Sequence, residues 1–118
     1  DENGGEEKSV EELFRLIQKA DMNVTFTGGD PMLHPEGFTT LARMIKENTD
    51  KTIWCYTGYR FEDLIHHPQR KALLEWCDVL VDSPFIWTER DLSLPFRGSR
   101  NQRIIDVQAS LKGGIIEL

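Results

Sequence analysis

Residues 24–35 read VTFTGGDPMLHP, and the order of residue types in this stretch decides the fold. A short β-branched and aromatic run, which favours a strand, stops at two glycines, an aspartate and a proline. Apolar residues then recur at helical spacing between residues 38 and 45, with Pro35 near the start, where its missing N–H group is tolerated. The stretch therefore predicts a strand, a tight turn and a helix in succession.

The same alternation of strand and helix continues along the chain. Further strands are predicted at residues 52–57, 78–82 and 103–107, and further helices at residues 9–20 and 60–77, the last broken near Pro68. Strands that alternate with helices form right-handed βαβ units, in which helices cover a parallel sheet. We therefore predict the α/β class and a parallel sheet of βα repeats, with residues 83–102 as a long irregular connection.

Length and charge limit the remaining possibilities. The 118 residues are predicted to form a single α/β domain, residues 1–118, because chains of this size rarely divide. The net charge of −6 disfavours nucleic acid and anionic membranes as partners, and no apolar run reaches the roughly 18 residues that span a bilayer. Residues 1–8 are acidic and are expected to be disordered. With two cysteines and no disulfide framework, the chain is predicted to be cytoplasmic.

Ligand contacts are predicted where the strands end, because ligands of open α/β sheets gather at the carboxyl ends of the strands. Gly28 and Gly29 would let a ligand approach the backbone there, and Asp30 would offer an acceptor to an ammonium group. The alternative for this turn is a glycine-rich connection whose aspartate is solvated. Residues 57–59, Thr-Gly-Tyr, admit the same two interpretations: a ring and a hydroxyl at a ligand, or a second βα turn.

Four segments taken together resemble a known family. VTFTGGDPMLHP, KTIWCYTGY, CDVLVDSPF and LPFRGSRNQRIIDV occur in this order between residues 24 and 107. They resemble the activating proteins of anaerobic ribonucleoside-triphosphate reductase, which are radical SAM enzymes. The resemblance implies a truncated partial (β/α) barrel. It also implies a [4Fe–4S] cluster that cleaves S-adenosylmethionine reductively, so that the resulting 5′-deoxyadenosyl radical takes a hydrogen atom from a glycine of the reductase.

The resemblance also implies roles for individual residues. The residues that it places around the cofactor in the first three segments are Gly28, Gly29, Asp30, Thr57, Gly58, Tyr59 and Asp82. The two glycines and Asp30 would hold the methionyl amino group of S-adenosylmethionine. The Thr-Gly-Tyr segment would line the cofactor pocket, and Asp82 is a further candidate for a polar contact.

The segment SRNQR, residues 99–103, is similar to a signature of the family and adds Asn101 and Arg103 to the implied cofactor site. Two interpretations remain open for it. Arg100 and Arg103 could pair with the cofactor carboxylate or with the partner protein, since guanidinium groups match carboxylates. The segment could instead be a structural loop that is anchored by asparagine and arginine hydrogen bonds.

One feature of the sequence departs from the family. The cluster requires the cysteine motif CxxxCxxC, because thiolates are the ligands of iron–sulfur clusters. The sequence lacks this motif, and Cys55 and Cys77 are expected to be buried apolar residues. The three histidines lack the spacing of metal ligands. We therefore expect the chain to begin just after the cluster loop, to contain no metal ligand or catalytic residue, and to be inactive as a fragment.

The resemblance implies two protein partners, the large subunit of the anaerobic reductase and an electron donor such as flavodoxin. A second interpretation within the same chemistry is an activase of another glycyl-radical enzyme, of the pyruvate formate-lyase type. A third, from a different class, is a non-catalytic α/β module that binds a ligand or a protein partner. The segment GSRNQRIIDV favours the reductase as the partner.

Overall fold

The computed structural model describes residues 23–27 and 29–118, and its elements follow the predicted alternation of strand and helix. They are β1 (Val24–Phe26), α2 (Pro35–Asn48), β2 (Ile53–Tyr56), α3 (Phe61–Leu64), α4 (Pro68–Leu74), β3 (Val79–Asp82), the 3₁₀ turn η1 (Trp87–Glu89), β4 (Arg103–Asp106) and α5 (Val107–Leu111). The predicted helix at residues 9–20 and the acidic residues 1–8 lie outside the described residues. Among the described helices, none has the length and apolar character needed to cross a membrane.

Prolines and a capping aspartate set the boundaries of several elements. α2 begins at Pro35, as predicted, and buries its apolar stripe. The predicted break near Pro68 is confirmed, because α3 ends at Leu64 and α4 begins at Pro68. The fourth strand ends one residue earlier than predicted. Asp106 accepts a hydrogen bond from the Ala109 amide (3.1 Å) and so caps α5, a short helix that the sequence patterns did not predict.

The sheet is mixed, with the strand order β1-β2-β3-β4. β1, β2 and β3 are parallel, which confirms the α/β class. The prediction of a wholly parallel sheet is wrong for β4, which pairs with β3 in the antiparallel sense and places Arg103 opposite Asp82. The physical reason is the connection between them: residues 83–102 contain only η1 and no crossover α-helix. Without a crossover the chain re-enters the sheet at the same end at which β3 finished. β4 therefore runs antiparallel to β3.

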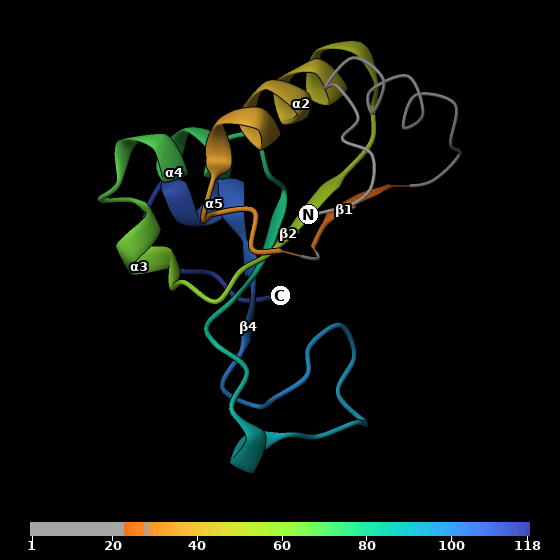
Figure 1. The fold of residues 1–118 in the computed structure, drawn as a ribbon, viewed down its shortest axis with the longest axis vertical. Helices are drawn as coiled ribbons and strands as arrows, with labels where there is room; N and C mark the ends of the chain where they lie inside the picture. The colour runs from red at the N-terminus through yellow and green to blue at the C-terminus, as the bar shows by residue number, and fades with distance from the viewer. Residues whose placement is uncertain (1–22, 28) are drawn as a thin grey trace.

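The hydrophobic core lies between the helices and one face of the sheet (Figure 1). Its members from the strands and from α2 to α5 include Val24, Phe26, Ile53, Cys55, Leu80 and Ile105 together with Leu41, Ile45, Leu64, Leu73 and Val107. Because side chains alternate along a strand, the next residues point to the other face. That second face, away from the described helices, carries Trp54 and Tyr56 of β2, which are half-buried.

Residues 84–102, which we call the arm, leave the sheet after β3 and extend away from the helices before they return as β4 (Figure 1). The arm folds back over part of the second face, where the rings of Phe96 and Trp54 lie 5.0 Å apart. The carboxyl-terminal residues pair with the outer side of β4 through a bridge between Ile105 and Glu117. β4 therefore has a partner on both sides.

Candidate functional site

The ends of all four strands that lie at the carboxyl side of β1 to β3 come together, and we call this end of the sheet the rim. β1, β2 and β3 are parallel and end there, as predicted. β4 begins there, because it is antiparallel to β3. The described segments of the rim are residues 29–30, 57–59, 82–83 and 102–103. The predicted site residues are therefore neighbours in the fold, apart from Asn101, which lies just outside these segments, and Gly28, which lies outside the described residues.

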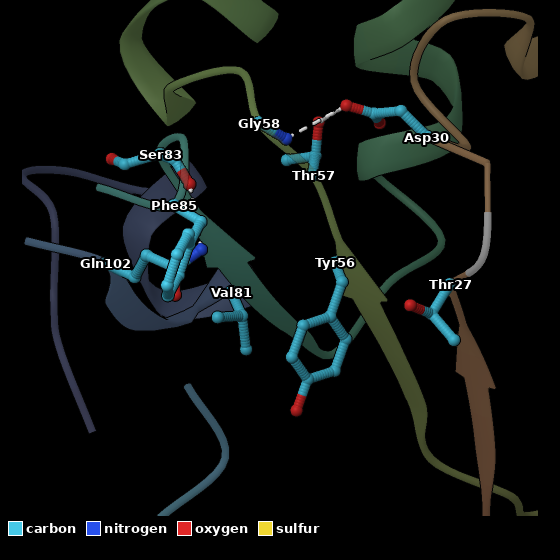
Figure 2. A pocket seen from close by; sticks show the side chains of 9 residues that line it. All are labelled: Thr27, Asp30, Tyr56, Thr57, Gly58, Val81, Ser83, Phe85 and Gln102. Atoms are coloured by element: carbon cyan, nitrogen blue, oxygen red, sulfur yellow. Dashed lines mark hydrogen bonds between the residues drawn. The ribbon is translucent and has the colours of Figure 1, made fainter. Parts of the chain in front are cut away.

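Asp30 links the first two strand ends through its carboxylate (Figure 2). Oδ2 accepts hydrogen bonds from the Thr57 hydroxyl (3.0 Å) and the Gly58 amide (2.9 Å), while Oδ1 accepts one from the Met32 amide (3.0 Å). A carboxylate has about four lone-pair positions, so the described residues leave one position on Oδ1 unoccupied. The three donors are neutral, and within the described part of the chain no ion pair involves Asp30. None of the described residues therefore compensates its negative charge.

A cavity of about 370 Å³ opens beside Asp30 (Figure 2). It is lined by Thr27, Asp30, Tyr56, Thr57, Gly58, Val81, Ser83, Phe85 and Gln102. Tyr56 belongs to the second face of the sheet, and burial raises the pKa of its hydroxyl above the ordinary value of 10.0. Small-molecule sites have volumes of roughly 300–1,000 Å³ and combine apolar walls with a few polar groups. The cavity has the size and the lining of such a site.

Tyr59 does not line this cavity; a ring and a hydroxyl at a ligand was one of the two interpretations of residues 57–59. Its ring packs against Arg70 of α4, whose guanidinium carbon lies 4.1 Å from the ring centroid. Arg70 also donates from Nε to the Met32 carbonyl oxygen (2.7 Å) and from Nη2 to the Tyr59 hydroxyl (3.2 Å). One side chain thus ties the turn after β1 to the turn after β2. The rings at the cavity belong to Tyr56 and Phe85.

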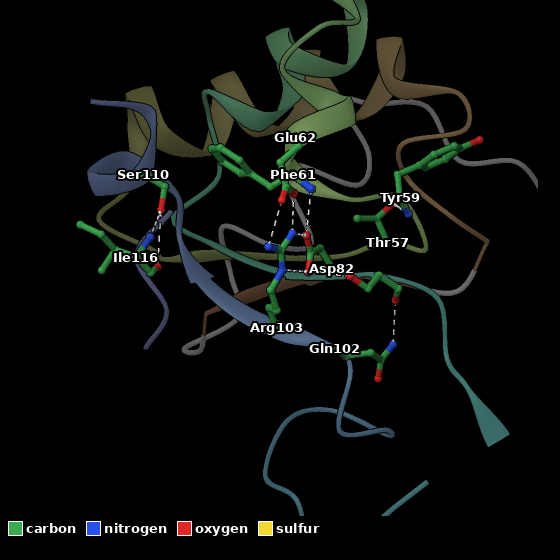
Figure 3. A network of polar contacts seen from close by, with 10 residues as sticks. Thr57, Tyr59, Phe61, Glu62, Asp82, Gln102, Arg103, Ser110 and Ile116 are labelled. Atoms are coloured by element: carbon green, nitrogen blue, oxygen red, sulfur yellow. Dashed lines mark hydrogen bonds and ion pairs between the residues drawn. The ribbon is translucent and has the colours of Figure 1, made fainter. Parts of the chain in front are cut away.

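Asp82, at the end of β3, is completely buried and is neutralised by Arg103 (Figure 3). Arg103 Nη2 lies 2.6 Å from Oδ2, and its Nε lies 3.0 Å from Oδ1. The Phe61 amide (2.8 Å) and the Ser83 hydroxyl (3.1 Å) donate to the same two oxygens. Four donors occupy the positions that a carboxylate offers, so none is left for a ligand. Asp82 therefore connects β3, β4 and the start of α3.

Arg103 forms a second ion pair with Glu62 of α3, at 2.6 Å and 3.2 Å (Figure 3). The hydrogen bond from Arg103 is the main cause that lowers the pKa of Glu62 below its ordinary value of 4.5. Hydrogen bonds to Asp82 and then to Glu62 raise the pKa of Arg103, so the guanidinium stays charged. Of the two interpretations of the SRNQR segment, the structural one describes Arg103.

Gln102 and Asn101 close the base of the arm. Gln102 Nε2 donates to the Ser83 carbonyl oxygen (3.1 Å), and its Oε1 accepts from the Ser99 amide (3.2 Å). Asn101 Nδ2 donates to the Pro84 carbonyl oxygen (2.8 Å). The segment therefore anchors a loop, as its structural interpretation predicts, and Gln102 also reaches the cavity.

The two cysteines lie in the core and do not form a cluster site. Cys55 and Cys77 are both fully buried. A hydrogen bond with Cys55, and then burial, raise the pKa of the Cys77 thiol well above its ordinary value, which disfavours the thiolate that a cluster needs. Within the described residues, no three His, Cys, Asp or Glu side chains come together as a group that could hold a metal ion. These residues therefore do not fit a [4Fe–4S] cluster.

Several residues at or near the rim were missed by the sequence analysis, among them Tyr56, Phe85, Arg70 and Glu62. Tyr56 stands one position before Thr57, and strand periodicity alone places it on the face opposite to Cys55. Arg70 and Glu62 come from helices and reach the rim only through the packing of α3 and α4. No local pattern in the sequence distinguishes these two from other charged helix residues.

The fold and the rim together define an α/β domain with a ligand-sized cavity at the carboxyl ends of its parallel strands. Residues 2–105 match the model of a family described as a 4Fe-4S single cluster domain. The match covers most of the chain.

Curated relatives identify the family more closely, and all three below are named anaerobic ribonucleoside-triphosphate reductase-activating protein. That of Haemophilus influenzae is 45% identical over 85 residues, 69% of this chain and 53% of the relative. That of Enterobacteria phage T4 is 35% identical over 103 residues, 81% of this chain and 61% of the relative. That of Salmonella typhi is 34% identical over 112 residues, 85% of this chain and 70% of the relative.

This chain belongs to the family of anaerobic ribonucleoside-triphosphate reductase-activating proteins. It spans about half the length of the Haemophilus influenzae relative, 53%. No solved structure matches the chain.

Proposed function

We propose that this chain forms the S-adenosylmethionine-binding part of a radical SAM activase that generates a glycyl radical on anaerobic ribonucleoside-triphosphate reductase. The proposed partners are the large subunit of that reductase and an electron donor such as flavodoxin, and the proposed compartment is the cytoplasm. The names of the relatives support the reductase as the substrate protein. The mixed sheet would be one part of a partial (β/α) barrel.

A single observation carries the proposal: among the described residues no cation pairs with the Asp30 carboxylate, and they leave one of its acceptor positions open beside the cavity. The methionyl part of S-adenosylmethionine carries an ammonium group, which matches such an acceptor. Hydrogen bonds between charged partners are roughly twice as strong as those between neutral groups. Thr57 and Gly58 orient the carboxylate by holding Oδ2, which leaves Oδ1 directed to the ligand.

Gly29 supports the same assignment. A Cβ atom built at this residue would meet nothing within 4 Å, and its φ lies outside the left-handed region of +20° to +160°. Neither packing nor backbone conformation therefore requires a glycine at this position. An open backbone at a strand end is what the close approach of a ligand requires, and Gly28 is proposed to act with Gly29 in this way.

When bound, S-adenosylmethionine would supply the 5′-deoxyadenosyl radical upon reductive cleavage. The residues of this chain would bind and orient it: Asp30 would hold the amino group, while Tyr56 and Phe85 would cover the ligand from the second face. Asp82 and Arg103 would position the rim rather than touch the ligand. The cluster ligands of the family motif are not among the residues of this sequence, whose cysteines are Cys55 and Cys77.

Isothermal titration calorimetry with S-adenosylmethionine tests the proposal. Asp30→Asn keeps the size of the side chain and removes its charge, so the affinity should fall about 10- to 100-fold, the equivalent of one hydrogen bond to a charged group. The matched control is Asp50→Asn, which removes an exposed carboxylate away from the rim and should leave the affinity unchanged. The melting temperature of each variant shows that the fold is retained.

Two results would contradict the proposal. One is equal affinity in Asp30→Asn and in the unsubstituted chain, which would remove Asp30 from the site. The other is the absence of any binding heat with the unsubstituted chain, which would leave the family relationship without a cofactor site in these residues. Retained binding in Asp50→Asn together with lost binding in Asp30→Asn supports it.

A further inference from the structure

Exposed apolar side chains are concentrated on the arm. In the described part of the chain the large exposed hydrophobic residues are Leu33, Phe85, Ile86, Trp87, Leu92, Phe96, Ile116 and Leu118, and five of these eight belong to residues 84–102. Trp87 is 67% exposed and Leu92 is 89% exposed. Exposed apolar groups gathered in one segment are typical of interaction sites, and Trp and Arg are enriched where binding energy concentrates.

Hydrogen bonds connect the outgoing and the returning side of the arm. The Arg100 amide donates to the Glu89 carbonyl oxygen (2.9 Å), and the Asp91 amide donates to the Gly98 carbonyl oxygen (3.1 Å). The Ile86 amide donates to the Ser99 hydroxyl oxygen, 3.2 Å away. A partner that docks on such a segment loses less free energy to ordering than one that binds a flexible loop.

Backbone strain occurs at the base and at the returning side of the arm. Ser83 and Phe96 are the two non-glycine residues with positive φ in the described chain, at 78° and 65°. Each such conformation costs on the order of 1–3 kcal/mol and persists only where the surroundings enforce it. Ser83 is enforced by the hydrogen bond from its amide to the Tyr59 carbonyl oxygen (3.0 Å). The strain turns the chain out of the sheet and so presents the arm to solvent.

The charge of the arm differs in sign from that of the whole chain. Residues 84–102 contain Arg90, Arg97 and Arg100 against Glu89 and Asp91, which is a net charge of +1 in a chain of −6. The guanidinium carbon of Arg90 lies 4.0 Å from the centroid of the Trp87 ring. Arg90 and Arg100 are both exposed. A segment with apolar anchors beside acidic side chains complements this surface, because opposite potentials favour association.

The arm is continuous with the cavity at the rim. Phe85 and Gln102, at its two ends, line the cavity beside Asp30 (Figure 2). The ring of Phe85 also packs edge-on against Trp87, with centroids 6.3 Å apart. An extended protein segment that lies on Trp87 therefore reaches the mouth of the cavity without crossing another element of the described chain.

We propose that the arm is the docking surface for the protein substrate, and that it binds an extended segment with apolar and acidic side chains. This inference rests on the proposed function, because it assigns the entry path to the same cavity. Trp87 and Leu92 anchor the segment, Arg90 and Arg100 attract its acidic groups, and Phe85 directs it to the rim. The segment approaches from the second face of the sheet, away from the helices.

Binding of the full chain to the purified large subunit of the reductase tests this assignment, with biolayer interferometry as the measurement. Trp87→Ala combined with Leu92→Ala should raise the dissociation constant at least about 30-fold, as expected for the loss of a hot spot. Arg90→Gln combined with Arg100→Gln should slow association several-fold and weaken its dependence on salt. Neither pair should change the affinity for S-adenosylmethionine, because none of these residues lines the cavity.

The matched controls remove similar groups elsewhere on the surface. Leu118→Ala truncates a leucine that is 68% exposed, and Lys112→Gln removes an exposed cation. Both should bind the reductase as the unsubstituted chain does. Their agreement with the unsubstituted chain, together with the loss in the arm variants, supports the docking surface.

Three outcomes separate the failure of this inference from the failure of the proposed function. If the arm variants bind the reductase like the unsubstituted chain, the docking assignment is overturned and the cofactor proposal stands. If the arm substitutions instead dissociate a dimer in sedimentation equilibrium, the occupant is a second copy and the assignment is again overturned. If the unsubstituted chain binds S-adenosylmethionine but not the reductase, the proposed partner is overturned together with the docking surface.

Discussion

Asp30 and Asp82 occupy comparable places at the same edge of the sheet, one in the turn after β1 and one at the end of β3. Asp30 accepts three hydrogen bonds from neutral donors and lines a cavity. Asp82 is completely buried, accepts four hydrogen bonds and is paired with Arg103 at 2.6 Å. The two carboxylates therefore differ in what remains available to a ligand.

The hydrogen bonds of the two carboxylates explain why one strand end can bind a ligand while the other holds structural elements together. A buried charge must be compensated within the protein, so Asp82 consumes its acceptor positions to hold β3, β4 and α3 together. A partly exposed carboxylate can keep its charge, because water or a ligand compensates it. We call the Asp30 side of the rim the open side, because its carboxylate lines the cavity, and the Asp82 side the closed side, because its carboxylate is fully hydrogen-bonded. The hydrogen bonds of the closed side fix the positions of the strand ends that surround the cavity.

The largest expected effect is on stability at the closed side. Asp82→Ala leaves the Arg103 guanidinium and the Phe61 amide without their buried acceptor, and breaking a buried pair costs about 3–5 kcal/mol. Asp30→Ala removes an acceptor of neutral donors and should cost about 1–3 kcal/mol. Urea unfolding followed by circular dichroism measures both changes in the free energy of unfolding.

If Asp82→Ala folds poorly, the comparison of the two aspartates can be tested with the double variant Asp82→Ala, Arg103→Met. Arg103→Met removes the charge that Asp82→Ala leaves uncompensated, so the two substitutions together should destabilise the chain less than the sum of their separate effects. Equal costs for Asp82→Ala and Asp30→Ala would show that the two strand ends are not different in the way described above.

An intermediate effect is expected on ligand affinity at the open side. Arg70→Met removes the hydrogen bond to the Met32 carbonyl oxygen (2.7 Å) and the contact with the Tyr59 ring. The turn that carries Asp30 loses a support, so the affinity for S-adenosylmethionine should fall about tenfold, the equivalent of one hydrogen bond. Lys71→Met, at the adjacent exposed position, is the control. An unchanged affinity in Arg70→Met would remove Arg70 from the support of the site.

The smallest expected effect is the pH dependence contributed by Glu62. Its pKa in the folded chain lies below the ordinary value of 4.5, because Arg103 donates to it. The carboxylate form therefore stabilises the fold above pH 4.5, and this contribution is lost as the pH falls through the lowered pKa. Since Glu62 is about half exposed, the contribution should stay below about 1 kcal/mol.

Thermal unfolding as a function of pH measures this contribution. Glu62→Gln should lose less stability than the unsubstituted chain between neutral and acidic pH, while Glu47→Gln, an exposed acid of α2, should follow the unsubstituted chain. Parallel curves for all three proteins would show that the pair of Glu62 with Arg103 contributes nothing to the closed side of the rim.

Much of the fold followed from local signals. The strand at residues 24–26, the helix that begins at Pro35 and the break at Pro68 were predictable, because β-branched runs, helical spacing and proline act within a few residues. The direction of β4 was not predictable in the same way. It depends on a connection, residues 83–102, that has no periodic pattern and whose path is set by contacts with Ser83 and Pro84.

In the candidate site, too, the residues that directly follow strands were predictable, whereas contacts made by the helices were not. Asp30, Thr57 and Gly58 were placed at the rim by their positions after strands, and hydrogen bonds connect them in the structure. Tyr59 does not line the cavity, and its ring packs against Arg70 instead. That contact comes from α4, and the order of residues around Tyr59 carries no sign of it.

The order of residues by itself determined the alternation of strands and helices and the glycine-rich turn with its acid, because these depend on interactions between near neighbours in the chain. Only the tertiary structure decided which acid stays open. Arg103 reaches Asp82 and Glu62 across 21 and 41 residues, and it does so because β4 returns antiparallel to β3. Because Arg103 lies so far along the chain from Asp82, it can neutralise this carboxylate only after the sheet has formed.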